Sequence, residues 1–460
     1  MATELAAHRG NLGWHVSPDG RRERSLGLAE QFGGTEGGPG ARGDGMDLLI
    51  RNVRIAPGAE PTSLAIGGGR IVGIEREITG AAREVIDAEG HAALPGLLEP
   101  HVHLEKALLH RRVPSTTGTL EEAIRITGIL KARQEREDVL ARSRRVLDMA
   151  VRAGTTAMRV HPDVDLIQGL IGVETAVALR EEYRDLLDIQ IVAFPQEGLI
   201  KAPGTLELME KAMRLGADIA GGCPYNEATR EDTERHIDQV FDLAEKYGVP
   251  VDMHADFADE ATDARFATAE LIAERTIERG FRGRVSLGHV TSLGALAEEE
   301  AKPILARLCE ADIHIVTLPA TDVYLGGRGD RARQRRGLTP VRRLKEAGVN
   351  VAYSSNNVRN AFTPFGKADP LLIGNMLAHL AQYGTPQDQE DILRMSTYDA
   401  ARAMGIAADY GIAVGRQADL VILDTNDVAD ALLDVPVRLW VVKRGRITVV
   451  TRHSCEIRRS

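Results

Sequence analysis

Short apolar runs alternate with helix-forming stretches through the middle of the chain, and this alternation limits the folds it can adopt. Seven runs have the length and composition of buried strands: Thr155–Val160, Ile189–Phe194, Asp218–Gly221, Pro250–His254, Arg284–Gly288, Ile313–Leu318 and Asn350–Tyr353. An eighth run ends near His101. Eight strands with connecting helices in about 300 residues predict an α/β fold, a (β/α)₈ TIM-like barrel over residues 98–403. A doubly wound sheet is the alternative, but it predicts a glycine-rich phosphate loop after an early strand, and the sequence has none.

Both ends of the chain carry further strand-like runs, which we expect to form one small flanking β-sandwich from residues 46–97 and 404–455. The N-terminal runs predict a small antiparallel sheet that is incomplete by itself: Leu48–Ile55, Ser63–Ile66, Arg70–Ile74, Glu84–Ile86 and Ala92–Leu94. The C-terminal runs would complete it: Asp419–Leu423, Val437–Lys443 and Arg446–Val450.

Residues 1–45 differ from the rest of the chain in composition. They combine mixed charge with a series of glycines, and they lack the apolar core of a signal peptide. We expect a disordered tail here. Because strand-like alternation begins directly after Met46, Met46 is also a candidate natural start, and the tail is then a mis-assigned start.

The charge balance and the cysteine pattern argue against several classes of protein. The 57 Lys and Arg against 67 Asp and Glu give a net charge of −10, and the basic residues are scattered among acids. We therefore expect no nucleic-acid binding. The longest apolar runs fall far short of the ~20 residues that cross a bilayer, so no membrane partner is expected either. Three widely spaced cysteines form neither a disulfide framework nor a cysteine zinc site, which fits a cytoplasmic protein.

Polar side chains, many of them histidines, follow most of the expected strands. In a (β/α)₈ barrel the residues at the carboxyl ends of the strands form the active site. His101, His103 and His254 would supply a neutral three-nitrogen site with an open position, which suits Zn²⁺ or a similar ion that activates water. The other strand-end positions are His161-Pro-Asp163, Gln196-Glu197, Asp256, His289 and Ser354–Asn357.

Each of these residues also has an ordinary structural interpretation. A His-X-His pair in an alternating strand is usually two histidines on one face of the sheet. His161 and His289 could be polar residues at strand ends, and Gln196 could cap a barrel loop. The metal site is favoured because several such residues stand at the matching ends of separate strands.

Several segments resemble the amidohydrolase superfamily. They are the run Leu94-Pro-Gly-Leu-Leu-Glu-Pro-His101-Val-His103-Leu, the run Ile191-Val-Ala-Phe-Pro-Gln196-Glu-Gly, His254, the pair Gly288-His289, and the run Tyr410-Gly-Ile-Ala-Val-Gly-Arg-Gln-Ala-Asp-Leu-Val-Ile-Leu. Over about residues 47–450 the chain is most similar to the cytosine deaminase group, which includes the N-isopropylammelide isopropylaminohydrolases. The resemblance implies one divalent metal ion, held by the His-X-His pair, the strand-five histidine and a strand-eight aspartate.

Transferred residue by residue, the resemblance makes His101, His103 and His254 metal ligands. It makes His289 the residue that orients the attacking water, and Gln196 the residue that hydrogen-bonds the substrate ring. Two positions depart from the pattern. Phe257 stands where the deaminases place a glutamate, and Asn356 stands where they place the metal-binding and proton-shuttling aspartate.

These two departures change the expected chemistry. Phe257 removes an acid and suits an apolar or already polarised substrate, so cytosine itself is not expected. Asn356 can offer its amide oxygen to the metal but cannot take a proton; an uncharged ligand set should also lower the pKa of a coordinated water toward ~7. Asp256, Asp163 and His289 are then the candidates to manage protons. His161 and Lys106 are further substrate-binding candidates.

The function predicted from these residues is a metal-dependent hydrolase that cleaves a non-peptide C–N bond of a cyclic amide, amidine or N-heterocycle. The alternatives are a metal enzyme of another class on the same scaffold, such as a lyase, isomerase or thiocarbamate hydrolase, and a catalytically inactive homologue. The expected cofactor is one divalent ion, Zn, Fe, Co or Mn, because imidazole suits several metals. The expected partners are a small heterocyclic or amide substrate and further copies of the chain in a homo-oligomer.

Overall fold

The computed structural model describes residues 14–16, 22–24, 45–332 and 334–458. Strands β1 (Trp14–Val16) and β2 (Arg22–Arg24) pair antiparallel within the first unit of the chain, residues 1–40. Residues 41–460 form a second compact unit. Most of the expected tail at residues 1–45 lies outside the described residues, and the proposal that Met46 is the natural start stays a prediction.

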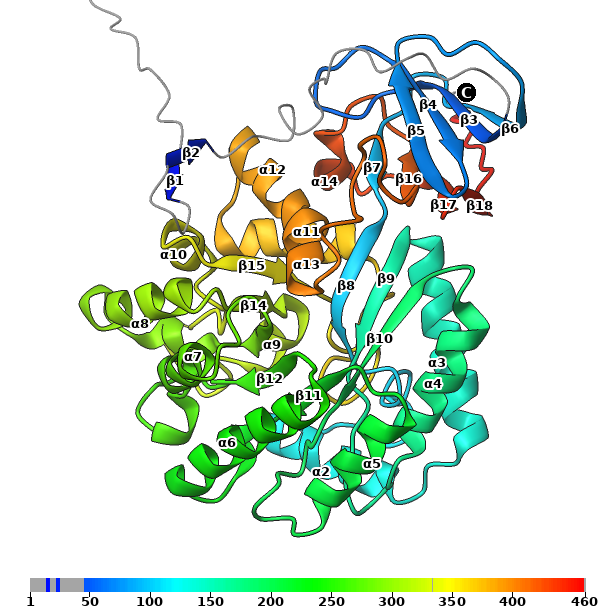
Figure 1. Cartoon of the computed structure of the whole chain (residues 1–460). Coiled ribbons are helices and arrows are strands. Elements are labelled where there is room, and N and C mark those ends of the chain that lie inside the picture. The colour runs from blue at the N-terminus through cyan, green and yellow to red at the C-terminus, as the bar shows by residue number, and fades with distance from the viewer. Residues whose placement is uncertain (1–13, 17–21, 25–44, 333, 459–460) are drawn as a thin grey trace, which may run out of the picture. The chain divides into compact units, whose positions relative to one another are not determined.

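Eight parallel strands form a barrel in the second unit (Figure 1). Val102 at the end of the first barrel strand bridges Asn356 just beyond the last, which closes the sheet. The (β/α)₈ prediction is confirmed, and the strand bounds differ from the expected ones by a few residues at most. The barrel strands are β8 (Leu97–Val102), β9 (Thr155–Val160), β10 (Asp188–Ala193), β11 (Ile219–Gly222), β12 (Val251–Ala255), β13 (Val285–His289), β14 (His314–Thr317) and β15 (Asn350–Tyr353).

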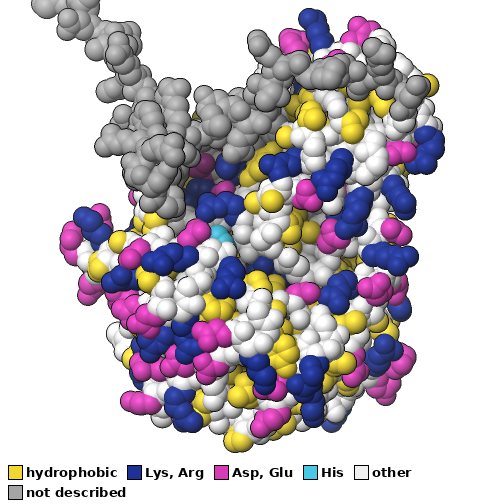
Figure 2. All heavy atoms as spheres, viewed as in Figure 1, with side chains coloured by type: hydrophobic (Ala, Val, Ile, Leu, Met, Phe, Trp, Pro, Cys, Tyr) yellow, Lys and Arg dark blue, Asp and Glu magenta, His cyan; other side chains and the backbone are white. Residues whose placement is uncertain are grey.

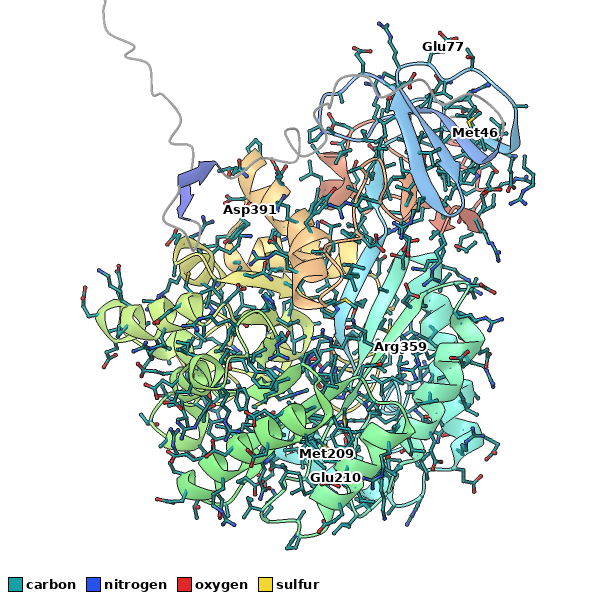
Figure 3. The ribbon with its side chains drawn as sticks, viewed as in Figure 1. Met46, Glu77, Met209, Glu210, Arg359 and Asp391 are labelled. Carbon is teal, nitrogen blue, oxygen red and sulfur yellow. The ribbon has the colours of Figure 1, made fainter. Side chains whose placement is uncertain are left out.

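Helices cover the outside of the barrel, so both faces of most strands are buried, as in other parallel sheets. In α6 the side chains that face the strands recur at helical spacing, with Ile237, Val240, Phe241 and Ala244 all buried. Ion pairs join neighbouring helices at the surface, such as Glu210 Oε1 to Lys246 Nζ at 2.6 Å (Figure 3). The helices after the strands are α3 (Arg136–Arg152), α4 (Ile171–Tyr183), α5 (Thr205–Leu215), α6 (Arg230–Tyr247), α7 (Ala269–Glu278), α8 (Glu298–Glu310), α10 (Val341–Glu346), α11 (Pro370–Ala381), α12 (Pro386–Met395) and α13 (Tyr398–Ala403).

Two further helices lie between a strand and its covering helix. Helix α2 (Leu120–Lys131) precedes α3, and α9 (Pro319–Leu325) precedes α10. Thr119 caps α2 by accepting a hydrogen bond from the Glu122 backbone N–H. Because these helices follow the carboxyl ends of β8 and β14, they bring side chains to the mouth of the barrel, where the site forms.

Two four-stranded sheets come from the chain ends that flank the barrel. The first, in the order β5-β4-β3-β6, uses strands before the barrel only, and the second, in the order β18-β17-β16-β7, combines β7 with three strands after it. The first contains β3 (Met46–Val53), β4 (Thr62–Gly67), β5 (Arg70–Glu75) and β6 (Ala82–Asp87). The second contains β7 (Ala93–Pro95), β16 (Leu420–Leu423), β17 (Arg438–Lys443) and β18 (Arg446–Val450), and helix α14 (Asp430–Asp434) lies between β16 and β17.

The expectation of a purely antiparallel N-terminal sheet is wrong, because β6 pairs with β3 in parallel. Strands β5 and β6 lie on opposite edges of the sheet, so residues 76–81 cross it instead of making a hairpin. The next strand, β7, belongs to the second sheet, where it pairs with β16 from the other chain end. The expected division into residues 1–45, residues 46–97 with 404–455, and residues 98–403 stays a prediction.

Basic and acidic side chains are interspersed on the face of the molecule shown in Figure 2. Among the described residues, no helix combines the length and the apolar character needed to cross a membrane. The expected absence of nucleic-acid and membrane partners stays a prediction.

A buried lysine joins the second sheet to the barrel. Lys443 on β17 has a side chain that is 1% exposed, and its Nζ lies 2.7 Å from Asp188 Oδ2 on β10 and 2.6 Å from Asp419 Oδ2. The Arg444 backbone N–H also donates to Asp419, at 2.7 Å. Asp419 is 8% exposed, so water can replace the lysine only poorly.

We expect Lys443→Met to lower the free energy of unfolding by about 3 kcal/mol, because it leaves the Asp419 carboxylate buried without its cation. The matched control is Arg446→Met on the neighbouring strand, whose exposed side chain lies 3.8 Å from Asp185 and should change stability by less than about 0.5 kcal/mol. Urea denaturation followed by circular dichroism measures both. Equal losses from the two variants would contradict the prediction.

Candidate metal centre

Three histidine side chains converge inside the mouth of the barrel. Nε2 of His101 and Nε2 of His103 each lie 3.0 Å from Nε2 of His254. His101 and His103 are two positions apart on one strand end and therefore point to the same side, into the barrel. Gly288 makes room for the first of them, because a Cβ there would lie 3.0 Å from His101 Cε1.

The three imidazoles are neutral. Burial lowers the pKa of each well below its ordinary value. Neighbouring imidazoles lower the pKa of His101 and His254 further, and Lys106 lowers that of His103. Neutral imidazoles offer the lone pairs that a metal ion needs.

The hydrogen bonds around these residues fit a divalent cation. His103 Nδ1 lies 2.9 Å from the His161 carbonyl oxygen, so Nδ1 carries the proton and Nε2 the lone pair. The amide oxygen Oδ1 of Asn356 is buried and has no hydrogen-bond partner among the described residues. A buried oxygen without a partner is costly, and a cation beside it would remove that cost. The three imidazole nitrogens form a donor set suited to Zn²⁺ or a similar ion, and Asn356 lines the same cavity.

Asn356 is held at the site by the closure of the barrel. Its N–H donates to the His101 carbonyl at 3.0 Å, and its own carbonyl accepts from the His103 N–H at 2.9 Å. Its φ of 56° lies in the left-handed region, which asparagine tolerates better than most residues. Two residues before His101 on β8, the buried Glu99 carboxylate accepts hydrogen bonds from Ser354 and Ser355, which ties β8 to the end of β15.

A narrow cavity opens above the histidines. Its polar side contains Gln196 and Lys106, whose Nζ donates to Gln196 Oε1 at 3.2 Å. Its apolar side contains Phe257 and Phe362, which pack with residues of α2 and α9. The lining residues are His103, Lys106, Leu120, Ile124, Gln196, Tyr225, Asn226, His254, Phe257, His289, Thr321, Asn356, Asn357 and Phe362. No carboxylate is among these described lining residues.

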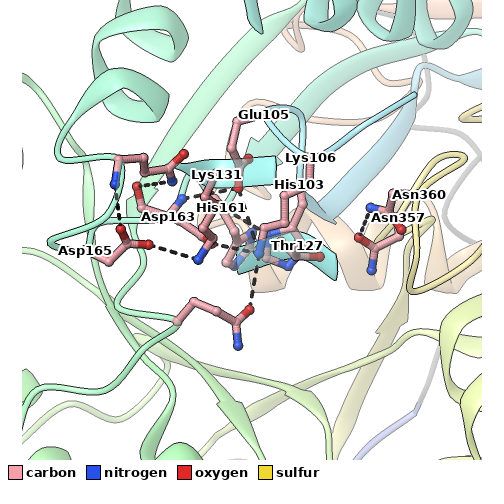
Figure 4. Close-up of polar contacts among 12 residues, drawn as sticks. His103, Glu105, Lys106, Thr127, Lys131, His161, Asp163, Asp165, Asn357 and Asn360 are labelled. Atoms are coloured by element: carbon pink, nitrogen blue, oxygen red, sulfur yellow. Dashed lines mark hydrogen bonds and ion pairs between the residues drawn. The ribbon is translucent and has the colours of Figure 1, made fainter. Parts of the chain in front are cut away.

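Asp163 lies behind Lys106 and not in the cavity. Its carboxylate is shared between Lys106, at 2.7 Å, and Lys131 of α2, which also contacts Asp165 (Figure 4). Lys131 contacts Glu197 as well. Burial alone would raise the pKa of Asp163, but the two lysines outweigh burial and hold it below its ordinary value. The structure therefore gives Asp163 the position of a counter-ion that anchors Lys106.

Asp256 and His161 are also turned away from the cavity. The Asp256 carboxylate accepts hydrogen bonds from the N–H groups of Thr268 and Ala269 and so caps α7. His161 is fully buried, stacks on His101 with 3.8 Å between ring centres, and places Nε2 3.1 Å from Asp252 Oδ1. Neither geometry supports the role in proton transfer or substrate binding that we expected for these residues.

His289 does line the cavity, as expected. Its ring stacks on Phe257, with ring centres 4.2 Å apart and planes 24° apart. Its Nδ1 lies 2.7 Å from Oδ1 of Asp322, a fully buried residue of α9. Because Nδ1 contacts Asp322, Nε2 is the ring nitrogen that is free to interact with a molecule in the cavity.

A family model described as the amidohydrolase family matches residues 108–450, which is more than half of the chain. The chain belongs to the amidohydrolase family. The family predicted from the sequence motifs is confirmed.

Known relatives of this amidohydrolase span nearly its whole length. It is 32% identical to the N-isopropylammelide isopropyl amidohydrolase of Pseudomonas sp. strain ADP, over 88% of this chain and 97% of the relative. It is 31% identical to the crystal structure of 5-methylcytosine deaminase from Klebsiella pneumoniae with 5-fluorocytosine, with a TM-score of 0.83 over 89% of this chain and 99% of that chain. The N-isopropylammelide isopropylaminohydrolase structure from Burkholderia multivorans has 32% identity and a TM-score of 0.77, over 87% of this chain and 97% of that chain.

Several residues of this amidohydrolase site were missed in the sequence. Tyr225 and Asn226 follow β11, and Thr321 and Asp322 follow β14. The signal was present, because both pairs lie in the segments that follow expected barrel strands, and every such segment of a (β/α)₈ barrel is a candidate. Lys131 had no such signal, since it reaches the site from a helix between β8 and α3.

We expect His101→Ala or His254→Ala to reduce the bound metal of this amidohydrolase to less than about a tenth of the parent content, because two remaining imidazoles hold a divalent ion poorly. Elemental analysis after dialysis measures the metal. The control is His379→Ala, an exposed histidine on α11, which should keep the parent content. Full metal content in either first variant would contradict the ligand assignment.

Proposed function

We propose that this amidohydrolase uses one divalent metal ion to hydrolyse a C–N bond that joins an amino or alkylamino group to an N-heterocycle, cyclic amide or cyclic amidine. Membership in its family, with relatives named as deaminases and amidohydrolases, makes the chain a hydrolase of C–N bonds other than peptide bonds. The observation that carries the proposal is the convergence of three buried, neutral imidazole nitrogens at the mouth of the barrel.

His101, His103 and His254 would hold the ion, with Asn356 Oδ1 as a fourth donor. When bound, the ion supplies a Lewis acid that activates water. Zn, Fe, Co and Mn are all compatible with imidazole ligands. We also propose that the protein is a cytoplasmic homo-oligomer.

The cavity above the ion suits a planar ring with one polar edge. Gln196 and Lys106 supply an amide and an ammonium group on one side, and both can hydrogen-bond ring nitrogens or carbonyl oxygens. Phe257 and Phe362 supply apolar surface on the other side, which suits the ring face or an alkyl substituent. The relatives named for N-isopropylammelide, 5-methylcytosine and pterin suggest substrates of this class.

His289 is the residue that we assign to the attacking water. Its Nε2 is on the cavity side, and among the lining residues it is the imidazole not needed for the ion. We do not assign this role to Asp163 or Asp256, because Lys106 and Lys131 contact the first carboxylate and the start of helix α7 donates hydrogen bonds to the second.

A second candidate function is a metal enzyme of another class, such as a lyase, isomerase or thiocarbamate hydrolase. It is favoured by the lack of a carboxylate among the described lining residues. The discriminating assay incubates the metal-loaded protein with aminated and alkylaminated pyrimidines, triazines and pterins and measures released ammonia or amine. Release that stops when a chelator removes the metal supports the proposed hydrolase. Turnover without any amine supports the second candidate, and a protein without metal or turnover is an inactive homologue.

We expect Gln196→Ala to raise KM by about tenfold while kcat falls less than about threefold, because Gln196 binds the ring equally in the ground state and the transition state. Steady-state kinetics on the best substrate of the assay measure both constants. Gln387→Ala, at an exposed position of α12, is the control and should change neither. An unchanged KM would remove Gln196 from the substrate site.

We expect Asn356→Asp to tighten metal binding by about tenfold or more, because it replaces a neutral oxygen donor with an anionic one. The added charge should also raise the pKa of the metal-activated water and move the acidic limb of the pH profile upward. Competition with a chelator and a kcat profile against pH measure the two effects. If both match the parent, Asn356 does not touch the ion.

A further inference from the structure

A buried carboxylate stands directly behind His289. Asp322 is fully buried in α9, and its Oδ1 lies 2.7 Å from His289 Nδ1. Its other oxygen, Oδ2, accepts the backbone N–H of Leu318 at 3.3 Å. Both oxygens therefore face nitrogen atoms, and one of these nitrogens belongs to an N–H that can only donate.

Two contacts hold the ring of His289: Phe257 stacks on one face, and Asp322 contacts Nδ1. Thr339 Oγ1 donates a hydrogen bond at 2.5 Å to the backbone carbonyl of His289 and does not touch the ring. His289 and the following Val290 have φ values of 73° and 54°, and this backbone turn sets the direction in which the His289 side chain leaves the chain. With Nδ1 toward Asp322, which is not among the lining residues, Nε2 lies on the cavity side.

We propose that Asp322 is a positioning residue that fixes the tautomer of His289, with the proton on Nδ1 and the lone pair on Nε2. His289 can then only accept a hydrogen bond in the cavity, from the attacking water or from a substrate N–H. This inference rests on the proposed function, because it names the group that holds the water-orienting histidine in its working form.

The amide oxygens of the cavity have other partners. We assign that of Asn356 to the ion, and that of Gln196 accepts from Lys106. Those of Asn226 and Asn357 accept from Lys201 and Asn360. A carboxylate placed in the cavity would accept a hydrogen bond directly, but Asp322 reaches the cavity only through the imidazole. The proton position on His289 therefore decides whether this imidazole accepts a hydrogen bond from the water or donates one to it.

The variant that tests this is Asp322→Asn. The Leu318 N–H needs an acceptor, so the asparagine turns its oxygen toward Leu318 and its amide N–H toward His289 Nδ1. The histidine then carries its proton on Nε2 and donates into the cavity. We expect kcat to fall by about a thousandfold with an unchanged metal content, as for other catalytic histidines held in the wrong tautomer.

The control is Thr339→Val, which removes a hydrogen bond to the same histidine without touching its ring nitrogens. It should lower the melting temperature and leave kcat within about threefold of the parent. If Asp322 had a purely structural role, Asp322→Asn would, like Thr339→Val, lower the melting temperature and leave kcat within about threefold of the parent. Asp322→Glu keeps a carboxylate and should recover part of the lost kcat.

The decisive measurement does not need a substrate. Nitrogen-15 NMR of protein labelled at histidine and loaded with Zn²⁺ distinguishes a protonated from an unprotonated Nε2, and the spectrum of His289→Gln identifies the signal. We expect an unprotonated Nε2 in the parent and in Thr339→Val, and a protonated one in Asp322→Asn. A protonated Nε2 in the parent, or no change in Asp322→Asn, would overturn the proposal. A failure to bind metal or to release amine would instead contradict the proposed function.

Discussion

The closure of the barrel between its first and last strands is the constraint on which the candidate site depends. Val102 pairs with Asn356, residues far apart in the chain, and the backbone of Asn356 bonds to His101 and His103. Glu99 strengthens this junction through Ser354 and Ser355. The same backbone bonds therefore close the sheet and bring Asn356 to the cavity that the histidines line.

The charges around the site are arranged in two layers. The cavity lining has Lys106 and neutral groups, while the acids Glu99, Asp163, Asp256 and Asp322 lie behind it. Each of these carboxylates has donors of its own: serines, lysines, the start of a helix, or an imidazole. A buried carboxylate is stable only with such partners. Asp163 and Asp322 each contact a residue that lines the cavity, Lys106 and His289 respectively.

The sequence was sufficient for the parts of the structure that depend on local pattern. The apolar runs predicted the barrel strands to within a few residues, since a strand that is buried by helices on the outside and by the barrel interior on the inside is a nearly continuous apolar segment. The His-X-His spacing placed two imidazoles on one side of a strand. The parallel pairing of β6 with β3 was not predictable in this way, because the residues of a short strand do not show whether its neighbour runs parallel or antiparallel. The roles of Asp163, Asp256 and His161 also depended on partners from distant segments, such as Lys131 of α2 and Thr268 of α7.

By itself, the sequence determined the barrel architecture, the family and the set of residues at the strand ends, because periodicity and residue type are local properties. Only the tertiary structure decided which strand-end residues face the cavity. Asp256 directly follows β12, His289 is the last residue of β13, and both have positive φ values, yet the Asp256 side chain contacts a helix start and that of His289 lines the cavity. The direction of each side chain follows from the donors and acceptors that long-range packing brings within hydrogen-bond distance, and those are not encoded in the spacing of the residues.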